Sequence, residues 1–268
     1  MRKSLLSLAV LSTLAVPALS FADEAAPVVA PAAEAAPVNT VAYNVGLYSQ
    51  YIFRGLTQTA NKPAIQGGVD YTNISGFYLG TWASNVSWLE DAALGGHTSG
   101  YKNSSLELDL YGGYRGAIKD VAYDVGLLQD VYPGTPNAGI ARAETTEVYG
   151  ALTYKWVTAK LSVAVSDKVF GIVNASGTYY ADITANYPVT DTITATVHVG
   201  RQDYSGSGND VNSYTDWKIG ASKAFANGVT VGAYYTDTNA KVSAYGPTVY
   251  SGGNIADAQG TIYVQKTF

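Results

Sequence analysis

The sequence predicts an all-β fold, a transmembrane antiparallel up-and-down β-barrel of about twelve strands with short periplasmic turns and long extracellular loops. Three observations predict it. Apolar and polar residues alternate with a period of two along most of the chain after residue 40. Short and long connections follow one another in turn between these segments. The mean hydropathy is only +0.02, as expected when lipid-facing and lumen-facing side chains alternate.

The N-terminal residues 1–22 have the pattern of a secretory signal peptide. Arg2 and Lys3 form a positive head, and an apolar run covers residues 5–19. Ser20-Phe21-Ala22 then places small residues at the two positions that a signal peptidase reads. We expect cleavage after Ala22 and export of the mature chain.

Residues 23–39 are rich in Ala and Pro and show no strand alternation, so we expect a flexible lead-in. We interpret this segment as a spacer, with a periplasmic tether or a partner-binding tail as the alternative. The barrel is expected to occupy residues 40–268.

The predicted strands are clearest where side chains of opposite character alternate. Between Ser104 and Arg115, three leucines alternate with Glu107, Asp109 and Tyr111. About twelve such segments occur, an even number as in bacterial barrels. Their expected spans are 41–56, 63–71, 76–86, 104–115, 120–132, 144–155, 157–166, 177–187, 191–202, 214–223, 228–239 and 258–268.

The connections alternate in length, as a barrel with both termini in the periplasm requires. Short turns follow the even-numbered strands, and long loops follow the odd-numbered strands apart from the first. A soluble β-sandwich gives no reason for such regularity. The short turns are 72–75, 116–119, 156, 188–190 and 224–227, and the long loops are 87–103, 133–143, 167–176, 203–213 and 240–257.

Composition excludes several other classes of protein. The formal net charge is −5, and it becomes −7 without Arg2 and Lys3, so no basic surface is expected for nucleic acid. The chain has no cysteine, which excludes disulfides, thiolate metal sites and a cysteine nucleophile. No apolar run after the signal approaches the ~20 residues of a transmembrane helix.

Six segments of the chain carry a likeness to a known family. They are Ser49–Thr59 (SQYIFRGLTQT), Pro63–Thr72 (PAIQGGVDYT), Gly76–Val86 (GFYLGTWASNV), Asp109–Gly116 (DLYGGYRG), Tyr123–Gly134 (YDVGLLQDVYPG) and Gln265–Phe268 (QKTF). Together they resemble the TorF family of porins, which was earlier catalogued as a conserved proteobacterial family of unknown function. The resemblance implies an outer-membrane location and a pore, and it brings no catalytic residues with it.

Charged residues within the strands are the candidate pore lining. A Lys or Arg that faces lipid at mid-depth costs about 2–4 kcal/mol, so the strand charges are expected to face inward. They either form a selectivity lining or neutralise one another as a polar filling, and an excess of carboxylates mildly favours cations. The candidates are Arg54, Asp70, Glu107, Asp109, Asp124, Glu147, Lys155, Lys160, Asp182, Asp216 and Lys218.

Arg54 lies in one of the family-like segments, within FRG. It is either a cation at a constriction or a brace that pairs with Asp70 across the first hairpin. We favour the brace, because a lone inward Arg among several acids is expected to pair.

Aromatic residues near strand ends are expected to form girdles at headgroup depth. The alternative is a carbohydrate-stacking path along the lumen, built from Tyr111, Tyr149, Tyr180, Tyr234 and Tyr263 if these face inward. The predicted girdle residues are Tyr43, Trp82, Trp156, Tyr187, Trp217 and Phe268.

His97 and His198 are the only histidines. His97 lies with Asp91 and Ser99 in a predicted loop, and His198 is expected to face the lumen near the outer rim. Nothing in the sequence orients either residue as a catalytic base or a metal ligand. We therefore expect no enzymatic activity, no catalytic residue, no metal and no cofactor.

The function predicted from these features is an outer-membrane porin for passive diffusion of small solutes or ions, with mild cation selectivity. The alternatives are a structural or adhesive barrel and a lipid- or peptide-acting barrel enzyme. Expected partners are outer-membrane lipid, small solutes or ions, and the barrel-assembly machinery, which would read the C-terminal strand ending in Phe268; no nucleic acid is expected. Lys266 departs from the aromatic or apolar residue usual on that face of the last strand.

Overall fold

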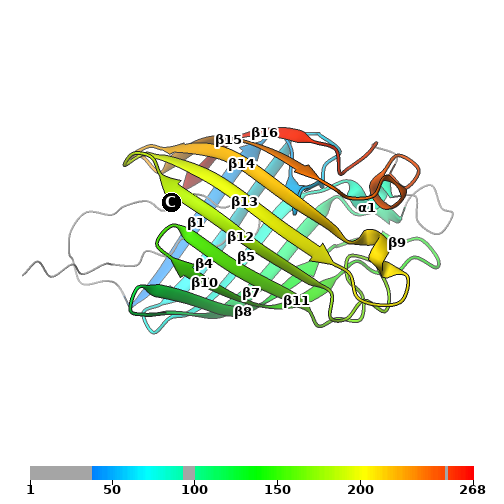
Figure 1. The fold of residues 1–268 in the computed structure, drawn as a ribbon, viewed down its shortest axis with the longest axis horizontal. Helices are drawn as coiled ribbons and strands as arrows, with labels where there is room; N and C mark the ends of the chain where they lie inside the picture. The colour runs from blue at the N-terminus through cyan, green and yellow to red at the C-terminus, as the bar shows by residue number, and fades with distance from the viewer. Residues whose placement is uncertain (1–37, 93–99, 251–252) are drawn as a thin grey trace, which may run out of the picture.

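The computed structural model describes residues 38–92, 100–250 and 253–268. The signal peptide predicted for 1–22, most of the lead-in predicted for 23–39, and His97 lie outside these described residues. Twelve antiparallel strands form one closed barrel, which confirms the predicted fold class (Figure 1). The barrel strands are β1 (Asn39–Tyr48), β4 (Ala64–Asn73), β5 (Phe77–Asn85), β7 (Leu106–Ile118), β8 (Val121–Val131), β10 (Thr145–Tyr154), β11 (Val157–Ala164), β12 (Tyr179–Pro188), β13 (Ile193–Asp203), β14 (Tyr214–Ala224), β15 (Val229–Thr238) and β16 (Gln259–Thr267).

The barrel closes where the first and last strands pair. β1 pairs with β16 from Asn44 opposite Thr267 to Tyr48 opposite Tyr263. The rings of Tyr48 and Tyr263 stack inside the wall with centroids 5.1 Å apart. Closure gives every strand two neighbours, which satisfies the backbone groups that hydrocarbon cannot solvate.

The two ends of the barrel differ. Tight turns at 74–76, 119–120, 155–156, 189–192 and 225–228 lie at the end where β1 begins and β16 ends (Figure 1). Long loops lie at the other end and carry the remaining elements. These are β2 (Ile52–Phe53), β3 (Leu56–Thr57), α1 (Trp88–Asp91), β6 (Tyr101–Asn103), β9 (Thr135–Pro136), η1 (Asn209–Asn212) and α2 (Val242–Tyr245).

The prediction for the first strand was wrong at its C-terminal end. The strand was expected to span 41–56, but β1 ends at Tyr48, and residues 49–63 form a long loop that contains the β2–β3 hairpin. Arg54 and Gly55 adopt positive φ of 48° and 79°, and this left-handed turn reverses the chain. The first loop is therefore long like the others, and the long/short rhythm has no exception.

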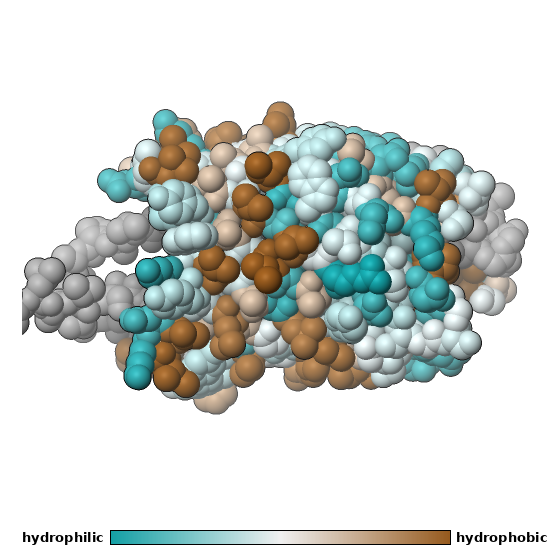
Figure 2. Space-filling model, viewed as in Figure 1, coloured by the Kyte–Doolittle hydropathy of each residue, from teal (hydrophilic) through white to brown (hydrophobic). Residues whose placement is uncertain are grey.

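The outer wall of the barrel is apolar. Leu47, Leu79 and Ile219 are 59%, 64% and 54% exposed on outward-facing positions. Hydrophobic residues gather over the strands, whereas the loop end is more hydrophilic (Figure 2). No helix in the described part of the chain is long and apolar enough to cross a membrane.

Inside the barrel, tyrosine rings lie over glycines of neighbouring strands. A Cβ on Gly80 would meet the Tyr111 ring at 2.3 Å, and a Cβ on Gly200 would meet the Tyr180 hydroxyl at 2.0 Å. Inward glycines thus make room for inward tyrosines, which explains part of the richness of the chain in both residues.

Candidate functional site

The structure places most of the predicted lumen charges on the inward face. Inward positions alternate with exposed apolar positions along each strand, as in β7, where Glu107 and Asp109 are buried and Leu110 is exposed. Nine predicted residues occupy such positions on the wall: Asp70, Glu107, Asp109, Asp124, Glu147, Lys160, Asp182, Asp216 and Lys218.

Lys155 is a prediction that the structure overturns. β10 ends at Tyr154, so Lys155 and Trp156 form the tight turn to β11. Lys155 has a positive φ of 55° and is exposed, with its Nζ 5.3 Å from the centre of the Tyr154 ring. It therefore lies at the turn end of the barrel and not in the lumen.

Two inward charges were missed. Asp130 lies on β8 with the same parity as Asp124, so the alternation in that strand could have identified it. Arg115 stands at the end of the predicted strand, and the observed strand continues past it to Ile118. The Arg115 Nε binds Asp124 at 2.9 Å across β7 and β8.

The loop of residues 49–63 folds into the barrel and places Arg54 against the opposite wall. Both terminal nitrogens of Arg54 bind Glu147 on β10, at 3.0 and 2.7 Å. Nη1 also donates to Gln202 on β13 at 2.8 Å. The guanidinium carbon lies 4.4 Å from the centre of the Tyr180 ring. Arg54 therefore crosses the lumen from the first loop to the far strands.

Arg54 does not brace Asp70, so that part of the prediction was wrong. Asp70 instead accepts a hydrogen bond from Tyr111 at 2.7 Å. The physical reason is the early end of β1: Arg54 leaves the wall with the hairpin and no longer faces β4.

Other contacts anchor the same loop. The Tyr51 hydroxyl donates to Glu107 on β7 at 3.1 Å. The backbone N–H of Thr57 donates to the carbonyl of Ile255, and that of Trp88 donates to the carbonyl of Gln58. The hairpin is thus tied both to the wall and to two other long loops.

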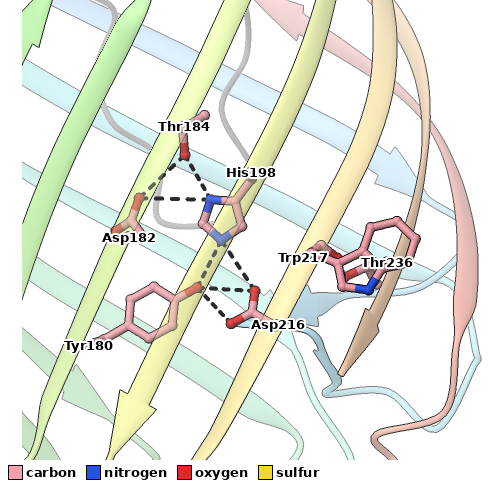
Figure 3. A network of polar contacts seen from close by, with 7 residues as sticks. All are labelled: Tyr180, Asp182, Thr184, His198, Asp216, Trp217 and Thr236. Atoms are coloured by element: carbon pink, nitrogen blue, oxygen red, sulfur yellow. Dashed lines mark hydrogen bonds and ion pairs between the residues drawn. The ribbon is translucent and has the colours of Figure 1, made fainter. Parts of the chain in front are cut away.

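A polar network surrounds His198 on β13 (Figure 3). Its Nε2 lies 3.2 Å from Asp216 and 2.9 Å from the Tyr180 hydroxyl. Its Nδ1 lies 2.7 Å from the Thr184 hydroxyl and 3.8 Å from Asp182. The ring is fixed from both sides, which fits a structural polar filling of the lumen.

The order Thr184, His198, Asp216 is that of a nucleophile, a base and an orienting acid. However, Thr184 lies inside β12, which pairs with β11 on one side and β13 on the other. The backbone N–H groups around it are therefore engaged in the sheet and cannot form an oxyanion hole. The arrangement gives no support to catalysis in the described part of the chain.

The aromatic predictions divide into two groups. Trp82 was expected in a girdle, but it is 2% exposed, faces inward on β5 and packs edge-on against Tyr51. Its parity with the inward Tyr78, and not its residue type, determines its direction. The other five predicted girdle residues are exposed, and their depth in a bilayer stays a prediction: Tyr43, Trp156, Tyr187, Trp217 and Phe268.

The lumen contains many side chains, and those at the Arg54–Glu147 pair are among the most deeply buried. The side chains of Glu147 and Arg54 are 1% and 7% exposed. Exposure is higher farther from the loops, at 10% for Arg115 and 14% for His198. The five tyrosines considered for a stacking path all face inward and are buried: Tyr111, Tyr149, Tyr180, Tyr234 and Tyr263.

Beside the hairpin, the outer loops and the strand ends line a small cavity of about 90 Å³. Its lining includes Phe53 and Leu56 from the hairpin, Trp88 from α1, and Tyr245 and Tyr250 from the last long loop. Gln202, which binds Arg54, also lines this cavity, so the cavity adjoins the Arg54 site.

Comparison with known proteins places the chain in a family. The sequence model of a family described as "Bacterial protein of unknown function (Gcw_chp)" matches residues 32–268. The chain belongs to this family. A comparison of the Gcw_chp chain with curated proteins finds no match. The resemblance to TorF porins stays a prediction, because the matching family carries no such name.

Solved structures similar to this Gcw_chp chain include outer-membrane porins. A KdgM porin matches with a TM-score of 0.51 and 8% identity, covering 86% of this chain and 99% of that one. A NanC porin matches with a TM-score of 0.50 and 9% identity, over 85% and 99%. An outer membrane channel from Pseudomonas putida F1 matches with a TM-score of 0.48 and 12% identity, over 94% and 100%. At these identities the likeness to the porins shows a shared fold.

Proposed function

We propose that this protein is an outer-membrane channel for the passive diffusion of small solutes or ions, constricted by the loop of residues 49–63. The observation that carries the proposal is the hairpin inside the closed barrel, held by Arg54 on Glu147 and Gln202. A loop clamped across a lumen narrows the path and sets what can pass. A barrel that only served as an anchor or scaffold would not need a charged side chain bound across its lumen.

The apolar outer wall supports insertion in a bilayer, and the signal expected at residues 1–22 supports export. Outer-membrane lipid is then the partner of the wall. We further propose that the assembly machinery recognises the terminal strand, which ends in Phe268, 69% exposed.

The charges that face the lumen support a mild preference for cations. Eight carboxylates and four Lys or Arg side chains face the lumen in the described chain. Two ion pairs lie in the lumen, Glu147 with Arg54 and Asp124 with Arg115. Outside these pairs, six carboxylates stand against Lys160 and Lys218: Asp70, Glu107, Asp109, Asp130, Asp182 and Asp216.

Planar-bilayer recording of the purified, refolded chain tests the proposal. We expect discrete conductance steps and, in a salt gradient, a reversal potential that shows a modest cation preference. Asp182→Asn should reduce that preference, because the Asp182 side chain is 11% exposed in the lumen. Asp191→Asn is the matched control, since Asp191 is exposed in a tight turn. Absence of channel events from folded protein would refute the channel.

A further inference from the structure

Three carboxylates meet beside the hairpin at the loop end of the lumen. Glu107 and Asp109 are two residues apart on β7 and so share its inward face. Asp109 is the direct cross-strand partner of Asp130 on β8. One oxygen of each carboxylate lies within 4.8 Å of the other two. All three residues are only 1% exposed.

This arrangement is unfavourable unless a cation or shared protons offset the repulsion among the carboxylates. Like charges directly opposite each other on paired strands destabilise the pair, and buried carboxylates are normally paired or coordinate a metal. Glu107 accepts hydrogen bonds from Tyr51 and Tyr132, and Asp109 and Asp130 bond to each other. One oxygen of each acid nevertheless has no hydrogen-bond partner among the described residues: Glu107 Oε2, Asp109 Oδ1 and Asp130 Oδ2. The unpartnered oxygens therefore indicate a bound cation.

The cations near the cluster are already engaged. Arg54 interacts electrostatically with Asp130, but both of its terminal nitrogens bind Glu147. Trp82, the cross-strand partner of Asp109 on the other side, adds an apolar wall. The low dielectric constant of these apolar surroundings strengthens the repulsion among the three carboxylates. It strengthens their attraction for a cation by the same factor.

We propose that Glu107, Asp109 and Asp130 bind one calcium ion, which holds the Tyr51 end of the hairpin in place. Calcium takes carboxylate oxygens at about 2.3–2.6 Å, so ligands on opposite sides of the ion are separated by at most about 5.2 Å. The three oxygens lie within 4.8 Å of one another, which satisfies that limit. Magnesium gives up its water reluctantly and is usually held by only one or two carboxylates, so a buried site of three carboxylates favours calcium.

The ion would act on the hairpin through Glu107. Oε2 of Glu107 would bind calcium, and Oε1 would keep its hydrogen bond from the Tyr51 hydroxyl. The wall, the ion and the loop then form one connected unit. This site departs from the expectation of no metal, and it does not depend on whether the barrel conducts.

Calcium titration of the full refolded chain in a detergent without charged headgroups tests the site. We expect saturable stabilisation, seen as a rise of the thermal unfolding midpoint in calcium compared with a chelator, and weaker stabilisation by magnesium. Asp109→Asn should abolish the calcium-dependent rise. In chelator the same variant should be at least as stable as the wild type, because it removes the repulsion between Asp109 and Asp130. Asp70→Asn, which changes another buried lumen acid, should keep the full calcium response.

Terbium luminescence provides a second readout at the same site. Excitation of Tyr51 or Trp82 should sensitise bound Tb³⁺, and calcium should displace it. Glu107→Gln serves where Asp109→Asn does not fold, and folding is checked by the heat-dependent mobility of the barrel in SDS gels. A wild type without a saturable calcium response, or an Asp109→Asn variant that retains it, would overturn the proposal and leave a cluster held by shared protons.

Discussion

The Arg54–Glu147 pair gives the sharpest prediction about stability. Arg54→Ala removes two hydrogen bonds to Glu147, at 3.0 and 2.7 Å, and one to Gln202 at 2.8 Å. It leaves behind the Glu147 carboxylate, whose side chain is only 1% exposed. Breaking a buried pair in this way costs about 3–5 kcal/mol, because one charge remains buried without a partner. Loss of the contact with the Tyr180 ring, 4.4 Å away, adds about 1–2 kcal/mol at most. We expect the free energy of unfolding to fall by about 3–7 kcal/mol in total.

Equilibrium urea unfolding in neutral detergent, followed by tryptophan fluorescence and gel mobility, measures this loss. Adding Glu147→Gln to Arg54→Ala should recover much of it, since no buried charge is then left unpaired. Asp70→Asn should instead be additive with Arg54→Ala, because Asp70 binds Tyr111 and not Arg54. An Arg54→Ala variant whose free energy of unfolding lies within about 0.5 kcal/mol of the wild-type value would refute the assigned role of the Arg54–Glu147 pair.

Three further predictions concern direction, charge and packing in the wall. Brominated lipid should quench the outward Trp217 and spare the inward Trp82, as single-tryptophan variants can show; equal quenching would contradict the assigned faces. Lys160→Ala should increase the cation preference in reversal-potential measurements, whereas Lys155→Ala at the turn should leave it unchanged. A change with Lys155→Ala and none with Lys160→Ala would contradict the placement of Lys160 in the lumen and Lys155 outside it. Gly113→Ala should destabilise the folded barrel by more than about 1 kcal/mol in urea unfolding, because the added Cβ would lie 2.3 Å from a backbone carbonyl oxygen. A variant as stable as the wild type would show that the backbone there can shift to accommodate the Cβ.

The wall of this barrel could be predicted from sequence because a period of two needs no knowledge of tertiary structure. Each strand carries its own alternation, and the turn lengths order the strands. Trp82 shows the limit of residue type as a guide. It was assigned to a girdle because it is a tryptophan. Trp82 follows Leu79 by three residues, however, so the two side chains must lie on opposite faces of β5, and the apolar Leu79 faces outward.

The interior could be predicted only in part. The first strand was predicted to extend to residue 56, but β1 ends at Tyr48, and the turn at Arg54 and Gly55 belongs to the hairpin that follows. The partner of Arg54 lies 93 residues away on β10, and no local pattern identifies it. The pairing of Asp109 with Asp130 depends on the register between β7 and β8, which the sequence alone does not specify.

The central claim is that the loop of residues 49–63 constricts a conducting lumen, and shortening this loop tests it most directly. Tyr48 and Ala64 are register partners, so an Asn-Gly turn can join β1 to β4 without disturbing the wall. Single-channel conductance of this variant should rise clearly above that of the wild type, because the loop and its Arg54 side chain no longer obstruct the lumen. Equal conductance in both folded barrels, or no conductance in either, would contradict the claim.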